Sequence, residues 1–211
     1  MILRISDNLR ILRSIINSKI GVLAMLNSNK HQAGSLLISE PFMIDPNFKR
    51  SVVLLVEKSE GGDIGFVLNQ RSDLLVSDLI PDCWNATFPV FVGGPVGKDT
   101  LHFIHRCYDK ISSGIEISEG LYWGGDFEGL KMLINSNQIR SDEVKFFVGY
   151  SGWGEDQLKS EIEQNSWLIE NNYKPDVLFV EDEENLWKEV VISLGPKYAH
   201  IVNFPENPSW N

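Results

Sequence analysis

Residues 51–69 read SVVLLVEKSEGGDIGFVLN, and this stretch decides the fold. Residues 51–57 are almost wholly apolar and rich in β-branched side chains, a pattern typical of a strand covered on both faces. Gly61, Gly62 and Asp63 supply a turn, and residues 64–69 form the returning strand. The sequence therefore predicts a β-hairpin inside a sheet whose two faces are both buried.

Further strands and helices are predicted on both sides of this hairpin. The predicted strands cover residues 35–39, 89–92, 101–106 and 144–150. Helices are predicted after Asp126, which would be the N-cap, at about 155–165, and at about 183–194, where Gly195 and Pro196 end the pattern. This order predicts an α+β (layered α/β) fold, a single compact domain over residues 33–211 with a mixed β-sheet surrounded by helices.

Size and charge exclude several classes of function. The chain has 211 residues, of which 43% are apolar and 23% charged, and its net charge is −10. A net negative charge opposes binding to DNA or to anionic membranes, and the sequence has no nucleic-acid-binding motif. No apolar run approaches the roughly 18 residues of a membrane span. We therefore expect no direct DNA binding and no membrane span.

The first 32 residues differ in charge from the rest. The basic residues among the first 30 are Arg4, Arg10, Arg13, Lys19 and Lys30, against Asp7 as the single acid. Apolar residues recur there at helical spacing, which fits a basic amphipathic helix on a membrane surface, a helix packed on the domain, or an extension upstream of Met25. We favour the last two readings, and expect deletion of residues 1–24 to leave the fold and the melting temperature nearly unchanged.

Cysteine and histidine content argues against disulfide and metal chemistry. Cys83 and Cys107 are too few for a secreted disulfide framework, which indicates a reducing cytoplasm and two small buried side chains. His102 and His105 fall on opposite faces of their strand, and His105 with Cys107 is no complete zinc ligand set. We expect neither a metal nor a cofactor, and a buried or hydrogen-bonded His105.

Two glycine-rich segments follow predicted strands, at residues 93–95 and 149–154. Residues 149–153 approach the nucleophile-elbow pattern, but Trp153 stands where glycine is required, so Ser151 as a nucleophile is a minority reading. Glycine in such places lets the backbone approach another segment or a ligand closely. Trp153 would either fill the core or line a groove, and we favour the groove because Tyr150 and Trp167 could fill the core alone.

These features combine into one candidate binding groove and one alternative. The groove residues are Asp45, Arg50, Ser51, Asn69, Gly93, Gly94, Pro95, His105, Gly149, Tyr150, Ser151, Gly152, Trp153 and Gly154. Asp45 and Arg50 could instead pair and hold a turn in place. The alternative function is a hydrolase that uses Ser151 or Cys107 with His105, which requires hydrogen-bond contact between them.

Several motifs occur in a fixed order along the chain. They are GSLLISEP at 34–41, DPNFKRSVV at 45–53, GFVLN at 65–69, VGGPV at 92–96, GYSGWG at 149–154 with QL at 157–158 and EI at 161–162, and SWL at 166–168. In these motifs, over about residues 33–195, the chain resembles the YqgE/AlgH family. The resemblance implies a bacterial α/β domain and an AlgH-like transcriptional regulator, and it carries over no catalytic residues.

The chain departs from that family in two places. Many relatives have Asn-Lys-Pro where this chain has Asn69, Gln70 and Arg71, and relatives usually begin only a few residues before the first strand. A regulator of this acidity would act indirectly, through an unknown protein partner or small molecule. We therefore expect a binding protein rather than an enzyme; a scaffold without a pocket is the third alternative.

Overall fold

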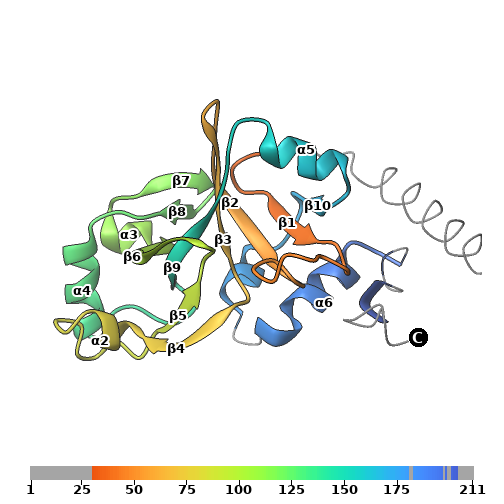
Figure 1. Ribbon diagram of the computed structural model, residues 1–211. Helices are drawn as coiled ribbons and strands as arrows, with labels where there is room; N and C mark the ends of the chain where they lie inside the picture. The colour runs from red at the N-terminus through yellow and green to blue at the C-terminus, as the bar shows by residue number, and fades with distance from the viewer. Residues whose placement is uncertain (1–29, 181–182, 197, 199–200, 204–211) are drawn as a thin grey trace, which may run out of the picture.

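The computed structural model describes residues 30–180, 183–196, 198 and 201–203 (Figure 1). The predicted basic segment at residues 1–32, and with it the expected result of deleting residues 1–24, lies outside the described residues apart from its last three positions.

The predicted central hairpin is confirmed. Strand β2 (Val52–Ser59) pairs antiparallel with β3 (Gly62–Val67), with Val53 opposite Val67. Residues 52–56 of β2 are at most 3% exposed, and their side chains alternate between two hydrophobic clusters. Burial on both faces is what the unbroken apolar run predicts.

The hairpin lies within a mixed sheet that contains ten strands among the described residues. Its main path runs β10-β1-β2-β3-β9-β6-β8-β7, and β5 joins it beside β9 with β4 at its outer edge. The remaining strand bounds are β1 (Leu36–Ser39), β4 (Arg71–Leu75), β5 (Pro89–Val92), β6 (Val96–His105), β7 (Ile115–Ser118), β8 (Leu121–Trp123), β9 (Val144–Trp153) and β10 (Trp167–Glu170). The β5–β9 pair is parallel and the others are antiparallel, so the mixed α+β fold is as predicted.

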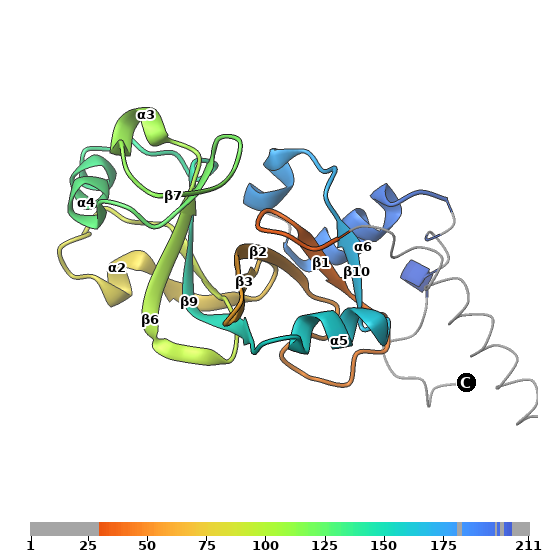
Figure 2. The ribbon, with the colours of Figure 1, turned by 90° about the horizontal axis from the view of Figure 1, so that it is seen from above.

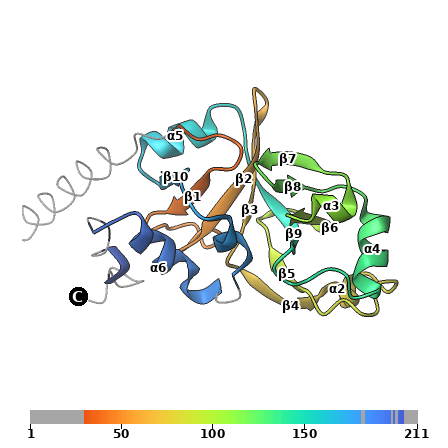
Figure 3. The same ribbon diagram turned by 180° about the vertical axis from the view of Figure 1, so that it is seen from behind.

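Helices cover the two ends of this sheet. Their bounds are α2 (Val76–Leu79), α3 (Tyr108–Ile111), α4 (Phe127–Asn135), α5 (Gln157–Glu163), α6 (Glu183–Ser193) and the 3-10 turns η1 (Pro175–Phe179) and η2 (Ile201–Asn203). Figures 1 and 3 show α2, α3 and α4 at one end of the molecule and α5 and α6 at the other. Seen from above, α5 and α6 lie on opposite sides of β1 and β10 (Figure 2). Among the described residues, no helix is both long enough and apolar enough to cross a membrane.

Buried side chains form three clusters. The largest packs α6 and η1 against β1, β2 and β3, and includes Trp187 and Phe66. A second packs α2, α3 and α4 against β5, β6 and β9 around Phe146. The third lies under α5 and the loop at residues 41–50, around Trp167.

One predicted boundary is wrong. The sequence predicts that the strand beginning at residue 144 ends at residue 150, but β9 continues to Trp153 because residues 151–153 pair with residues 63–65 of β3.

Candidate functional site

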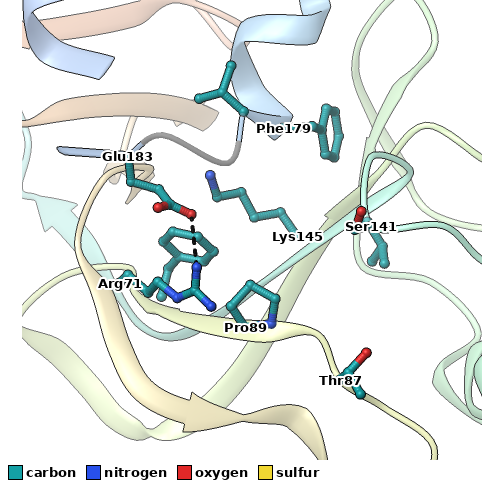
Figure 4. A pocket seen from close by; sticks show the side chains of 10 residues that line it. Arg71, Thr87, Pro89, Ser141, Lys145, Phe179 and Glu183 are labelled. Carbon is teal, nitrogen blue, oxygen red and sulfur yellow. Dashed lines mark ion pairs between the residues drawn. The ribbon is translucent and has the colours of Figure 1, made fainter. Parts of the chain in front are cut away.

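A pocket of about 280 Å³ lies between β5 and β9 on one side and the η1–α6 segment on the other (Figure 4). Its apolar walls are Phe91, Val144, Phe179 and Val180, with Pro89. Its polar lining residues are Arg71, Thr87, Ser141, Lys145 and Glu183. The pocket therefore combines an apolar interior with a small set of charged and hydroxyl groups, the usual composition of a small-molecule site.

Lys145 is the unusual residue in this pocket. It stands in β9 inside the apolar run of residues 144–148 and is 5% exposed. Its Nζ lies 4.0 Å from the ring centre of Phe91 and has no hydrogen-bond partner among the described residues. Figure 4 shows the amine pointing into the pocket. A buried ammonium without an acceptor is costly, so its presence needs an explanation beyond packing.

Burial, more than the neighbouring charges, sets the pKa of Lys145. Burial lowers the pKa of Lys145 to about 8, Glu183 partly opposes that shift, and Arg71 adds to it. Arg71 forms an ion pair with Glu183 at 3.8 Å and its side chain is half exposed, so it stands at the mouth while Lys145 lies inside. Two cations and one carboxylate leave a surplus of positive charge in the pocket.

The predicted groove residues lie in separate places. Gly93, Gly94 and Gly149 do come together, where the loop between β5 and β6 crosses β9. A Cβ on Gly94 would collide with the backbone of Tyr150 and Ser151, so these glycines serve a close approach of two segments of the chain. Pro95, Gly152 and Gly154 are exposed, and Gly154 lies beside Gly62 at the start of β3.

A second group surrounds the start of β2. The Asn69 side chain accepts a hydrogen bond from Val52 N and donates one to Arg50 O, both at 2.9 Å. Buried Ser51 donates its backbone N–H to Ser39 Oγ at 2.8 Å. These contacts hold Arg50 at a positive φ of 48°, with its guanidinium over the ring of Trp187 at 5.1 Å. Exposed Asp45 accepts hydrogen bonds from Asn47 in its own turn.

The Ser151–His105 pair needed by the hydrolase alternative is not formed. Ser151 is fully buried and its Oγ donates to Gly93 O at 3.0 Å. His105 pairs with Val144 at the far end of β9, seven residues away, which places the two backbones ~23 Å apart along the strand. The reading of Ser151 as a nucleophile served by His105 is therefore wrong.

Cys107 does lie beside His105, but both are buried. Cys107 Sγ is 3.8 Å from His105 Nδ1, and His105 Nε2 donates to Ser113 O at 3.1 Å. Burial raises the pKa of Cys107 to about 11 and lowers that of His105. A thiol that holds its proton so firmly is a poor nucleophile, so this pair favours a structural role. The expected buried, hydrogen-bonded histidine and free buried cysteines are confirmed.

The preference for Trp153 as a groove residue is corrected by its burial. Trp153 is 4% exposed and contacts Phe48 and Trp167, with ring centres 6.0 Å apart in both cases. Glu161 Oε2 accepts a hydrogen bond from the indole N–H of both Trp153 and Trp167, at 3.0 and 2.8 Å. Of the two residues expected to fill the core without it, Trp167 is fully buried and Tyr150 is half-buried, and Trp153 packs in the core beside Trp167.

Sequence reasoning missed the Lys145 pocket. In the sequence Arg71 stands out only as a departure from a family motif, and Glu183 only as the first residue of a predicted helix. The available signal was a lone lysine in the run VKFFV at residues 144–148, where every other side chain is apolar. Among the described residues, no group of three or more His, Cys, Asp or Glu side chains could hold a metal ion.

Comparisons with known proteins agree on one family. A family model described as AlgH-like matches residues 36–199. A UPF0301 protein of Cytophaga hutchinsonii is 42% identical over 180 residues, covering 84% of this chain and 98% of the relative. A UPF0301 protein of Chlorobaculum tepidum is 40% identical over 178 residues, covering 84% and 95%.

Solved structures show the same fold. The solution structure of the AlgH protein from Pseudomonas aeruginosa superimposes with a TM-score of 0.64 at 27% identity, over 84% of this chain and 96% of that one. A crystal structure of a Corynebacterium diphtheriae protein gives a TM-score of 0.72 at 22% identity, over 87% and 97%. With the match over residues 36–199, these relatives show that the chain belongs to the AlgH-like (UPF0301) family.

Proposed function

We propose that this protein is a non-enzymatic regulator that binds a small organic anion in the Lys145 pocket. In this proposal the bound state acts on transcription indirectly, through a protein partner. The observation that carries it is the unpartnered amine of Lys145, held on a strand inside a largely apolar pocket. A carboxylate would supply the missing acceptor, and its apolar body would pack on Phe91 and Phe179.

The position of the pocket supports a regulatory role. One wall comes from β5 and β9, and the other from η1 and the start of α6. A ligand between them would favour whichever arrangement of the two walls binds it better, and so would shift their relative positions. A partner that contacts the η1–α6 surface would sense that shift.

Isothermal titration calorimetry with benzoate, isovalerate and phenyl phosphate tests the ligand class. Benzyl alcohol and benzylamine, neutral and cationic compounds of similar shape, are the negative controls. We expect at least one anion to bind to the wild-type chain, and Lys145→Met to weaken it about tenfold or more, the loss of a charged hydrogen bond.

The matched control is Lys188→Met, which removes an exposed lysine from α6 and should leave binding unchanged. Circular dichroism would verify that both variants fold. Failure of all three anions to bind, or equal binding of anion and alcohol, would refute the proposed function.

A further inference from the structure

The structure gives Lys145 a feature that simple anion binding does not require. Its Nζ is buried, points into a cavity of about 280 Å³ and has no hydrogen-bond partner among the described residues. Two other partly buried lysines lie close to carboxylates: Lys110 is 2.8 Å from Glu143, and Lys131 is 2.7 Å from Glu128. Desolvation without a partner favours the neutral amine, and the neutral amine is the nucleophilic form of lysine.

We propose that Lys145 Nζ forms a reversible imine with an α-keto acid, whose carboxylate is held by Arg71. The inference rests on the proposed function, because it takes the same pocket and assigns the class of anion. A simple carboxylate would pair with Lys145, whereas in an α-keto acid the ketone meets Lys145 and the carboxylate pairs with Arg71. Arg71 stands at the mouth, and Lys145 lies deeper beside the apolar walls. An α-keto acid carries a carboxylate that can pair with Arg71 and a ketone that can react with Lys145. Its alkyl or aryl chain can pack on the apolar walls.

The reaction balances with groups that the pocket holds. The Nζ lone pair attacks the ketone carbon, and the carbonyl π electrons move to oxygen, which takes up a proton. The carbinolamine nitrogen then loses a proton, which balances the one taken up by oxygen. The hydroxyl takes up one further proton and leaves as water, while the nitrogen lone pair forms the C=N bond. The net change is amine, ketone and one proton giving a protonated imine and water, with no oxidant or reductant. Glu183 is the carboxylate in the pocket that can accept the nitrogen's proton and return it to the leaving hydroxyl.

The surroundings favour the product. A protonated imine has the same charge as the ammonium it replaces, so the electrostatic balance with Glu183 and Arg71 is kept. The imine carbon also carries the ligand's chain onto the apolar walls. The pKa of Lys145 of about 8 leaves ~10% of the amine unprotonated at neutral pH, a fraction about two orders of magnitude above that of an exposed lysine.

Reductive trapping tests this inference on the full chain. The protein would be incubated with α-ketoisocaproate and sodium cyanoborohydride, which reduces the C=N bond to a stable secondary amine. Intact-mass measurement and peptide mapping should then find one adduct, at Lys145. Lys145→Met should lose it, and Lys188→Met should keep it. No adduct, or adducts spread evenly over exposed lysines such as Lys188, would overturn the inference.

A second variant tests the part assigned to Arg71. Methyl isobutyl ketone has the same branched chain as α-ketoisocaproate but no carboxylate, and should label the wild-type chain at least about tenfold more slowly. Arg71→Met should weaken that preference clearly while Lys145 remains reactive. A preference of the same size in Arg71→Met as in the wild-type chain would refute the assigned role of Arg71.

The two proposals fail separately. If an anion binds in the calorimetric test but no adduct forms, the imine is wrong and the anion pocket stands. If neither binding nor an adduct is found, both proposals fall.

Discussion

At the scale of single residues, burying the ammonium of Lys145 lowers the stability of the fold, and a substitution can measure by how much. We expect Lys145→Met to raise the free energy of unfolding at pH 7 by about 1–3 kcal/mol, because an unpaired buried ammonium is replaced by an apolar side chain of similar length. Glu183 keeps Arg71 as its ion-pair partner in this variant. Urea denaturation is the measurement, with Lys188→Met expected to change stability by less than about 0.5 kcal/mol. A clear loss of stability in Lys145→Met would show that the amine has a favourable partner.

The pH dependence of the same residue has a definite sign. The pKa of Lys145 is about 8 in the folded chain, below the 10.5 of a free lysine, so the unfolded chain binds more protons between these values. Stability contributed by this group therefore rises between about pH 8 and pH 10.5, and its cost is fully present below pH 8. The charged groups facing Lys145 are Arg71 and Glu183, and the Arg106 ion pairs with Asp142 and Asp176 lie beyond Phe179.

The other titrating groups contribute equally to the unfolding free energies of the wild type and of Lys145→Met, so their contribution cancels in the difference between the two. That difference should shrink by up to about 3 kcal/mol between pH 7 and pH 10.5. A difference that stays constant across this range would mean that the amine is not desolvated.

Trp153 gives a second test at this scale. We expect Trp153→Ala to cost about 3–5 kcal/mol, because it removes a buried ring and one of the two indole donors to Glu161. Thermal denaturation would measure the loss. Trp84→Ala is the matched control, since Trp84 is 74% exposed and should be nearly neutral. Equal effects of the two substitutions would contradict the packing of Trp153 in the core.

At the scale of elements, the crossing of the β5–β6 loop over β9 depends on glycine. We expect Gly94→Ala to destabilise the chain by more than 2 kcal/mol, because a Cβ there meets the backbone of Tyr150 and Ser151, which cannot rotate away. Gly120→Ala is a fitting comparison, since its φ is also positive but its Cβ would meet no atom within 4 Å. Chemical denaturation of both variants separates steric collision from backbone strain. A Gly94→Ala loss no larger than that of Gly120→Ala would contradict the close crossing.

The sequence predicts those elements whose own residues carry an apolar pattern or a cap. It does not predict strands that form only because they pair with other strands. The β2–β3 hairpin and helix α4, with Asp126 accepting a hydrogen bond from Gly129 N, follow from apolar patterning and capping. Strands β7 and β8 are short and partly exposed, and they are strands because they pair with each other and with β6. The extension of β9 through residues 151–153 depends on β3, far away in sequence.

The candidate site was hidden for a related reason. A lysine on a strand normally points to solvent, and nothing near Lys145 in the sequence shows that η1 and α6 cover it some 30 to 40 residues later. Arg71 and Phe91, which also line the pocket, precede Lys145 in the sequence and lie on β4 and β5. The glycine motifs were easier to see, and the reason given for them, close approach of the backbone, is correct for Gly94.

At the scale of the whole molecule, net charge governs contact with nucleic acid. We expect the purified full chain not to shift a DNA fragment in a gel at low salt, because a net charge of −10 repels phosphate and the sequence lacks a reading motif. Tight, salt-sensitive binding by the protein alone would contradict indirect regulation. A helix-turn-helix protein run alongside would serve as the positive control for the assay.

Strand β9 has a consequence for how the molecule opens. It hydrogen-bonds to β3, β5 and β6, and so links the strands beneath α6 to those beneath α4. The strands beneath α6 and those beneath α4 both hydrogen-bond to the ten residues of β9, so neither group can unfold without breaking those bonds. The two groups should therefore unfold as one cooperative unit. In native-state hydrogen exchange, the β9 amides should be the slowest to exchange, at the global free energy of unfolding. Core substitutions at Leu130 and at Leu186 that lower the unfolding free energy by the same amount should increase the exchange rates of the β9 amides by the same factor.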